Sequence, residues 1–151
     1  MTLFIVFLFL AFYNAGNMTT LQLQHYGIYP AVPKDGFAEY MQANNRAAAL
    51  PTILPAMLLF LSTIALATVR PPFVSRFEVN AATTLNMIAF VSTFIWQRKL
   101  QGDMALTGYS EEKARLLIRT NWIRTISYLL LSALAISILV RVLRTGVGTP
   151  V

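Results

Sequence analysis

Four long runs of apolar residues are the feature of this sequence that most constrains its fold. They cover about residues 2–24, 47–69, 79–97 and 121–143. Each run is close to the roughly 20 residues that an α-helix needs to cross the hydrocarbon core of a bilayer. Because backbone amides and carbonyls inside lipid must pair within their own segment, the runs are predicted to be transmembrane helices. Their apolar residues are continuous and do not alternate with polar ones, which excludes a membrane β-barrel.

The composition favours the same conclusion. Of the 151 residues, 56% are hydrophobic and 12% are charged, whereas a soluble domain carries about 25% charged residues. No linker or repeat divides the chain, so a single membrane domain over residues 1–151 is expected. The first run lacks the basic region of a cleaved signal peptide, so we expect a retained helix. The predicted fold is an all-α integral membrane four-helix bundle.

Several kinds of chemistry are excluded by residues that the chain lacks. It has no cysteine and one histidine, so disulfides, thiolate ligands and sites built from several imidazoles of one subunit are ruled out. Haem ligation by His25 would need Met41 or a second subunit to supply the other axial ligand. The sequence contains no nucleophile elbow, phosphate-binding glycine loop or dinucleotide motif. No metal and no cofactor are therefore predicted.

Basic residues are distributed unequally between the two ends of the expected bundle. Eight lie at the end of the first and third loops and four at the other end, namely Lys34, Arg46, Arg98, Lys99, Lys113, Arg115, Arg119 and Arg124 against Arg70, Arg76, Arg141 and Arg144. If Arg46 and Arg124 lie inside the bundle, the bias falls to six against four. The positive-inside rule then predicts that loops one and three are cytoplasmic and that both termini lie outside a bacterial inner membrane. Because these residues flank the apolar runs, they suit anionic membrane lipid and not nucleic acid.

The second and fourth helices are predicted to be longer than the bilayer requires. Asp35 is expected to cap a helix that continues through the second run, with kinks at Pro51 and Pro55. Each proline lacks an amide donor and so frees a carbonyl one turn earlier. Ser110 is expected to begin the fourth helix, and the third helix is expected to stop at Arg98. Helices 2 and 4 would thus extend into a small helical head at the end with loops one and three.

The segment between the first run and Asp35 combines helix breakers with aromatic residues. Gly27, Pro30 and Pro33 are expected to prevent a long helix over residues 22–33. Its tyrosines and His25 suit an aromatic belt at the membrane surface. In the alternative interpretation, this loop folds over the head and helps to line a pocket.

Polar side chains inside the apolar runs follow helical spacing. Such groups are costly in lipid and usually face a partner or a cavity. Two sets each fall on one helix face, namely Asn121, Thr125, Tyr128 and Ser132 in the fourth run and Thr83, Asn86, Thr93 and Gln97 in the third. The simplest interpretation is hydrogen bonding between helices, at about 0.6 kcal/mol per contact.

Arg124 is the most demanding of these polar residues. A guanidinium at this depth needs a counter-charge or a ligand anion. Glu39 is the acidic candidate, because it belongs to the same end of the bundle. The competing explanation is a side chain that extends along the helix to reach water. Trp96 and Trp122 are expected to be anchors at the membrane surface.

The residues Thr-Asn-Trp-Ile-Arg-Thr at 120–125 resemble the signature of a family of small uncharacterised bacterial integral membrane proteins. Trp96-Gln97 and Tyr29-Pro30 agree with the same pattern, and the resemblance covers about residues 24–143. Relatives often carry histidines near the positions of Met41 and Asn44, so the departure here weakens any histidine-dependent metal or redox chemistry. The family has no settled activity. Weaker likenesses are to the eicosanoid and glutathione membrane enzymes and to anthrone-oxygenase-like proteins.

These observations support one leading hypothesis and two alternatives. The leading one is a protein that binds a lipophilic or amphipathic small molecule, or a partner protein, at the cytoplasmic end of the bundle. Its predicted ligand-binding residues are Asn121, Arg124, Tyr128, Arg46, Gln97, Tyr29, Tyr40 and Trp96. The first alternative is a membrane enzyme for oxidation or transfer on a lipid-soluble substrate, with His25 as general base and Tyr26 or Glu39 assisting. The second is an accessory subunit for a partner membrane protein, or a homo-oligomer whose polar faces pack together.

Overall fold

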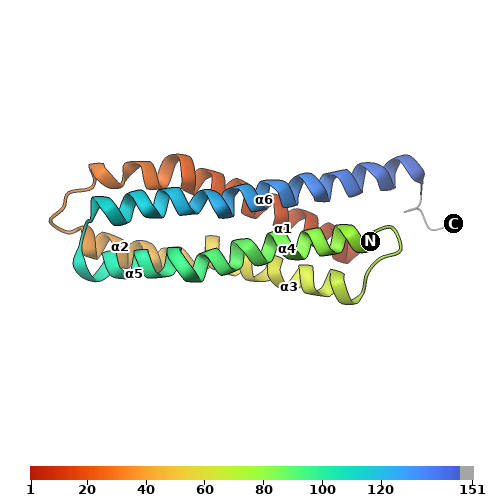
Figure 1. Cartoon of the computed structure of the whole chain (residues 1–151), viewed down its shortest axis with the longest axis horizontal. Helices are drawn as coiled ribbons and strands as arrows, with labels where there is room; N and C mark the ends of the chain where they lie inside the picture. The colour runs from red at the N-terminus through yellow and green to blue at the C-terminus, as the bar shows by residue number, and fades with distance from the viewer. Residues whose placement is uncertain (147–151) are drawn as a thin grey trace.

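The computed structural model describes residues 1–146, and within them the chain is all-α with no strand. The helical segments form four rods, which lie side by side along the long axis of the molecule (Figure 1). The first rod is α1 (Thr2–Thr20), a π-helical segment η1 (Leu21–His25) and a 3₁₀ segment η2 (Tyr26–Ala31). The second rod is α2 (Phe37–Ala47), the π-helical η3 (Ala49–Ile53) and α3 (Leu54–Thr68). The third is α4 (Arg76–Ser92), the π-helical η4 (Thr93–Gln97) and α5 (Arg98–Thr107), and the fourth is α6 (Glu111–Thr145).

Consecutive rods run antiparallel, so the amino terminus and the end of α6 lie at the same end of the bundle (Figure 1). In one half of the molecule, α1 packs against α3 and α6, and α4 packs against the same two helices. In the other half, α2 packs against α5, and η1 and η2 pack against α6. We call this second half the head. It contains the connections at residues 32–36 and 108–110.

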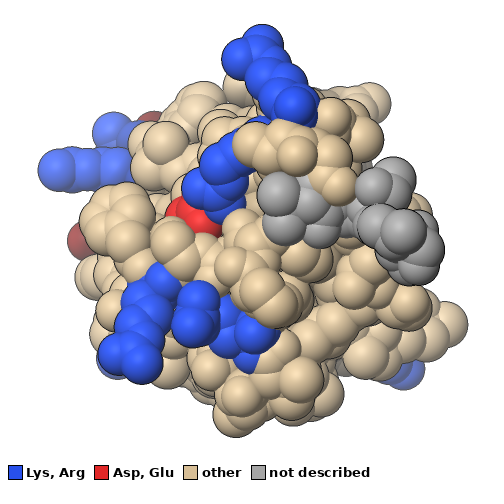
Figure 2. All heavy atoms as spheres, turned by 90° about the vertical axis from the view of Figure 1, so that its right-hand side faces the viewer, with Lys and Arg blue, Asp and Glu red and all other residues tan. Residues whose placement is uncertain are grey.

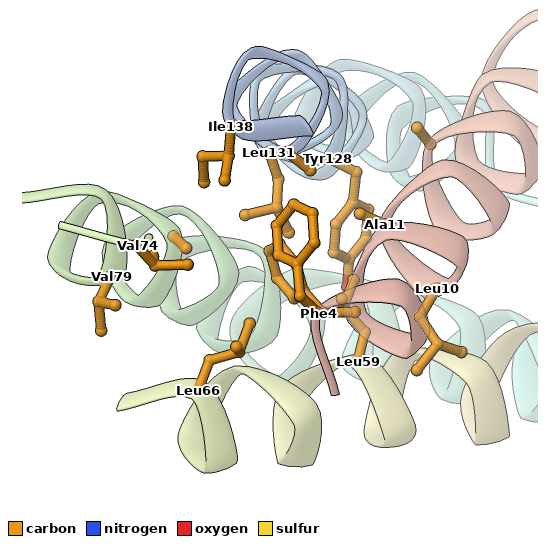
Figure 3. Packing of buried hydrophobic residues seen from close by; sticks show 14 of the residues in the cluster. Phe4, Leu10, Ala11, Leu59, Leu66, Val74, Val79, Tyr128, Leu131 and Ile138 are labelled. Carbon is orange, nitrogen blue, oxygen red and sulfur yellow. The ribbon is translucent and has the colours of Figure 1, made fainter. Parts of the chain in front are cut away.

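Four helical stretches are long and apolar enough to cross a membrane: Thr2–Ala31, Ala49–Thr68, Arg76–Thr107 and Glu111–Thr145. Their interior is an apolar core in which side chains from all four rods meet (Figure 3). Their outer surface is apolar as well, with Phe9, Leu61 and Leu130 each more than half exposed. A bundle that is apolar both inside and outside suits lipid as its surroundings.

The third rod extends past the point where the sequence predicted its end. The helix continues beyond Arg98 and Lys99 to Thr107, because Leu100 and Met104 lie four residues apart and are buried in the head. The charged pair therefore marks where the chain stops being apolar, not where the helix stops. The head is built from all four rods and not only from the second and fourth.

The first rod also continues further than expected. Gly27 and Pro30 do not end it, because the chain changes to π-helical and then 3₁₀ turns and remains helical to Ala31. These turns bury the rings of Tyr26 and Tyr29. The rod stops at Val32, which is extended, as expected for a residue that precedes proline.

Asp35 does not cap α2, contrary to the sequence prediction. The residue at the start of the helix is Gly36, with φ +94°, and no side chain caps it. The left-handed backbone favours glycine there, and the Phe37 amide donates to the Lys34 carbonyl at 3.2 Å. The prediction for Ser110 is confirmed, because its hydroxyl accepts a hydrogen bond from the Lys113 amide at 3.4 Å at the start of α6.

Pro55 has no amide hydrogen to donate to the Pro51 carbonyl, and side chains of the first rod donate to this carbonyl instead. Pro51 lies one turn before Pro55 in η3, and its carbonyl accepts hydrogen bonds from the Tyr13 hydroxyl and from Asn17 Nδ2, both at 3.0 Å. Asn14 Nδ2 donates to the Pro55 carbonyl at 3.1 Å. The proline segment thereby joins the first and second rods where an unpaired carbonyl would be costly.

Candidate functional site

A buried arginine on α6 is at the centre of the polar interior. Only 6% of Arg124 is exposed. Its Nε donates a hydrogen bond to Asn121 Oδ1 at 2.9 Å, and its Nη2 donates to the same oxygen. The Nη2 group also donates to the Tyr26 hydroxyl, at a distance of 3.2 Å. Its Nη1 has a longer contact, 3.5 Å, with Thr93 Oγ1. All of these acceptors are neutral oxygens.

No carboxylate balances the charge of Arg124 in the part of the chain that the structure describes. The ion pairs within residues 1–146 are Lys113–Asp103, Arg115–Glu111 and Arg141–Glu78. Glu39 is exposed on α2 and does not provide the counter-charge that was predicted for it. Arg124 does not extend outward to water either, because its guanidinium is buried among polar groups of the first, third and fourth rods.

A second set of amides holds the neighbours of Arg124 in place. Asn121 Nδ2 donates to Gln22 Oε1 at 2.8 Å, and Gln22 Nε2 donates to the Ile118 carbonyl at 3.2 Å. Gln101 Nε2 donates to the Tyr26 hydroxyl at 3.2 Å. Tyr26 therefore accepts hydrogen bonds from both the third and the fourth rod. We call Gln22, Tyr26, Thr93, Gln101, Asn121 and Arg124 the arginine network.

The π-helical segments lie where this network is built. Tyr26 follows η1 directly and Thr93 is the first residue of η4. A π-helical turn holds more residues than an α-helical turn and so shifts the direction in which the following side chains point; such turns are frequent at functional sites. Gln22, which belongs to η1, and Tyr26, which follows it, lie on the side of the first rod that faces α6.

An aromatic cluster adjoins the network in the head and contains His25, Tyr26, Tyr29, Phe37, Tyr40 and Tyr109. The Tyr26 and Tyr29 rings meet edge to face at 5.4 Å between centroids. The Tyr29 hydroxyl lies 3.4 Å from Nε2 of the half-buried His25. Partial burial raises the pKa of Tyr40 above its ordinary value, so this phenol remains neutral at physiological pH.

Several residues predicted for the site do come together. Arg124 donates hydrogen bonds to both Asn121 and Tyr26. The aromatic cluster contains Tyr29 and Tyr40. Gln97 lies one turn from Thr93 and donates to Thr120 Oγ1 at 3.0 Å. Its own Oε1 is buried without a hydrogen-bond partner among the described residues. Half-buried Trp96 packs against the apolar centre of the head.

Other predicted residues lie apart from the network. Arg46 is exposed, and its Nε bonds to the Gln42 carbonyl of its own helix at 3.3 Å. Tyr128 lies one turn beyond Arg124 in the apolar core. Trp122 lies on the outer surface of α6, 42% exposed.

Two members of the network, Gln22 and Gln101, were missed by sequence reasoning. Gln22 lies where the first predicted span overlaps the segment of residues 22–33, in which no long helix was expected. It was not considered for the site, although it follows Asn14 and Met18 at four-residue intervals on the buried face of the first rod. Gln101 was placed outside the third helix. If the predicted first and third helices had each been extended by two turns, helical spacing of 3.6 residues per turn would have placed both glutamines on the inward faces.

The described residues contain no group of three or more histidine, cysteine or acidic side chains that could hold a metal ion. The arrangement is instead a buried cation surrounded by neutral donors and acceptors, next to aromatic rings. Such a site can bind an anion or polarise a polar group. The chain matches no protein-family model, no curated protein and no solved structure.

Proposed function

We propose that this protein binds an amphipathic small molecule with an acidic head group, and that the head group pairs with Arg124. The observation that carries the proposal is a guanidinium that is 6% exposed and has no carboxylate partner among the described residues. Burying an uncompensated charge costs several kcal/mol. A carboxylate or phosphate on a ligand would offset that cost through charge-assisted hydrogen bonds.

The neighbours of Arg124 would allow a ligand anion to take the place of some of its present hydrogen-bond acceptors. Its Nη1 makes the longest contact of the network, 3.5 Å to Thr93, so this donor can turn to a ligand at little cost. The hydroxyls of Thr93 and Tyr26 can rotate and donate to an anion. The aromatic cluster beside them offers an apolar surface for the rest of the molecule. The binding residues proposed are Arg124, Asn121, Tyr26, Thr93 and Tyr29.

Native mass spectrometry of the full chain, released from a mild detergent, tests the proposal. The wild-type protein is expected to retain an added mass that an Arg124→Gln variant loses. Arg119→Gln is the matched control, because Arg119 is an exposed arginine on the same helix and its loss removes the same charge. Extraction and chromatography of the retained molecule then identify its acidic group.

Two results would contradict the proposal: a wild-type protein without added mass, or equal retention by Arg124→Gln and wild type. If Arg124→Gln does not fold, Arg124→Lys provides a second measurement. Lysine keeps the charge but loses the planar set of donors, so weaker retention of the same molecule is expected. Unchanged retention by a folded Arg124→Lys would also count against the site.

A second candidate function is catalysis on the same ligand. It rests on the His25 imidazole, which lies 3.4 Å from the Tyr29 hydroxyl and beside the ring of Tyr26, a hydrogen-bond partner of Arg124. This imidazole would act as general base near neutral pH. A His25→Ala variant that converts the identified ligand as fast as wild type would remove this candidate. The hypothesis of a homo-oligomer joined by polar faces has less support, since Asn121 and Thr125 form their bonds within the chain.

A further inference from the structure

A second group of arginines lies at the end of the bundle opposite the head, beside a groove that the Arg124 site does not use. The groove has a volume of about 620 Å³ and lies where α3 ends and α4 begins. Its polar lining includes Arg70, Arg76 and Asn80, and its apolar lining includes Ala67, Val69 and Val79. Figure 2 looks onto this end and shows basic side chains around a mostly uncharged surface.

The guanidinium of Arg70 is held by local structure, and Arg76 lies on the adjoining helix. Arg70 Nη1 donates to the Val74 carbonyl at 2.7 Å, which fixes this side chain against the α3–α4 connection. A guanidinium has five N–H donors, so Arg70 retains others for a ligand. Arg76 and Asn80 are four residues apart on α4 and therefore project from the same face.

The protein does not supply an acid for these arginines within residues 1–146. Glu78 is the acidic residue of this end, and its carboxylate is already bound to Arg141 at 2.9 Å and to the Ser75 amide and hydroxyl, both at 2.8 Å. Arg70 and Arg76 form no ion pair in the described chain. An anion that occupies the groove must therefore come from outside residues 1–146.

The position of the groove indicates which anion this is. Thr68 and Arg76 are the last and first residues of two helices that are apolar enough to cross a membrane, so the groove lies at the boundary between hydrocarbon and water. It presents guanidinium groups together with apolar side chains. We infer that this groove binds an anionic phospholipid, with the lipid phosphate between Arg70 and Arg76. This inference does not depend on the function proposed for Arg124.

Native mass spectrometry with added phosphatidylglycerol tests the inference. Wild-type protein in a neutral detergent is expected to retain phosphatidylglycerol in preference to phosphatidylcholine. A double Arg70→Gln, Arg76→Gln variant should bind phosphatidylglycerol at least about tenfold more weakly, because each basic residue at an anionic lipid contributes about 1 kcal/mol. Arg144→Gln is the control, since Arg144 is exposed near the same end and does not line the groove.

Three outcomes would overturn the inference. They are equal phosphatidylglycerol binding by the double variant and wild type, equal binding of the two lipids by wild type, and displacement of the lipid by millimolar inorganic phosphate. The last would mean that the groove is a site for free phosphate. The molecule retained at Arg124 should persist in the double variant, and phosphatidylglycerol should persist in Arg124→Gln, so the two proposals can fail separately.

Discussion

At the scale of single residues, the hydroxyl of Tyr26 connects the two parts of the candidate site. It accepts hydrogen bonds from Arg124 Nη2 and Gln101 Nε2, both at 3.2 Å, while its ring packs in the aromatic cluster. Replacing Tyr26 with Phe keeps the ring but removes the oxygen that accepts both hydrogen bonds. Gln101 Nε2 then loses its acceptor, and Arg124 Nη2 keeps only its bond to Asn121 Oδ1. We expect Tyr26→Phe to lower the free energy of unfolding by about 1–2 kcal/mol, measured by denaturant titration in detergent.

The matched control for this prediction is Tyr13→Phe. This variant also loses one hydroxyl, but the single hydrogen bond of Tyr13 to the Pro51 carbonyl is exposed. The Pro51 carbonyl also keeps Asn17 as a donor. A smaller loss of stability is therefore expected. Equal losses in the two variants would show that the Tyr26 hydroxyl does not hold the network together.

At the scale of helices, the starts of α4 and α6 differ in how completely they are capped. Ser75 begins α4 with a reciprocal capping box, in which its hydroxyl accepts from the Glu78 amide at 3.2 Å and its amide donates to Glu78 Oε2 at 2.8 Å. Ser110 makes a single contact of 3.4 Å with the Lys113 amide. The difference predicts unequal effects for the same substitution.

Ser75→Ala is expected to cost about 1 kcal/mol of stability and Ser110→Ala distinctly less. Ser75 also donates a hydrogen bond to Glu78, the partner of Arg141, so its loss weakens the contact between α4 and α6. Thermal unfolding of both variants, followed by circular dichroism, compares them directly. A larger effect for Ser110→Ala would contradict the prediction.

At the scale of the whole molecule, we propose that the head faces the cytoplasm of a bacterial inner membrane. Burial of Arg124 removes one residue from the count at the head, while Arg46 is exposed there, so seven basic residues remain against the four at the other end. The bias still favours a cytoplasmic head. In the proposed orientation, both ends of the described chain lie outside.

Labelling of single cysteines tests this orientation, because the chain has no cysteine of its own. Thr107 near the head and Pro72 at the other end are both exposed. Gly108 is a poor position, since its φ of +81° strains any other residue. A membrane-impermeant maleimide should label Pro72→Cys in intact cells and Thr107→Cys only after permeabilisation. The reverse pattern would invert the topology.

Much of the architecture follows from the sequence, because the properties that determine it are local. A run of about 20 apolar residues must pair its own backbone in lipid, so the four helices could be predicted without knowledge of their neighbours. Helical periodicity placed Asn121 and Tyr128 on one face, and both are buried. The free carbonyl that precedes Pro55 was also predictable, since it depends only on a missing amide.

The partners of the buried polar groups were decided by the tertiary structure alone. Arg124 meets Tyr26 across 98 positions of sequence and Thr93 across 31, and exposed Glu39 does not reach it. Which side chains meet depends on how each helix is rotated about its axis, and packing and the π-helical turns of η1 and η4 determine that rotation. Apolarity and spacing therefore determined which faces turn inward, whereas the alignment of neighbouring rods determined that Arg124 is surrounded by neutral oxygens.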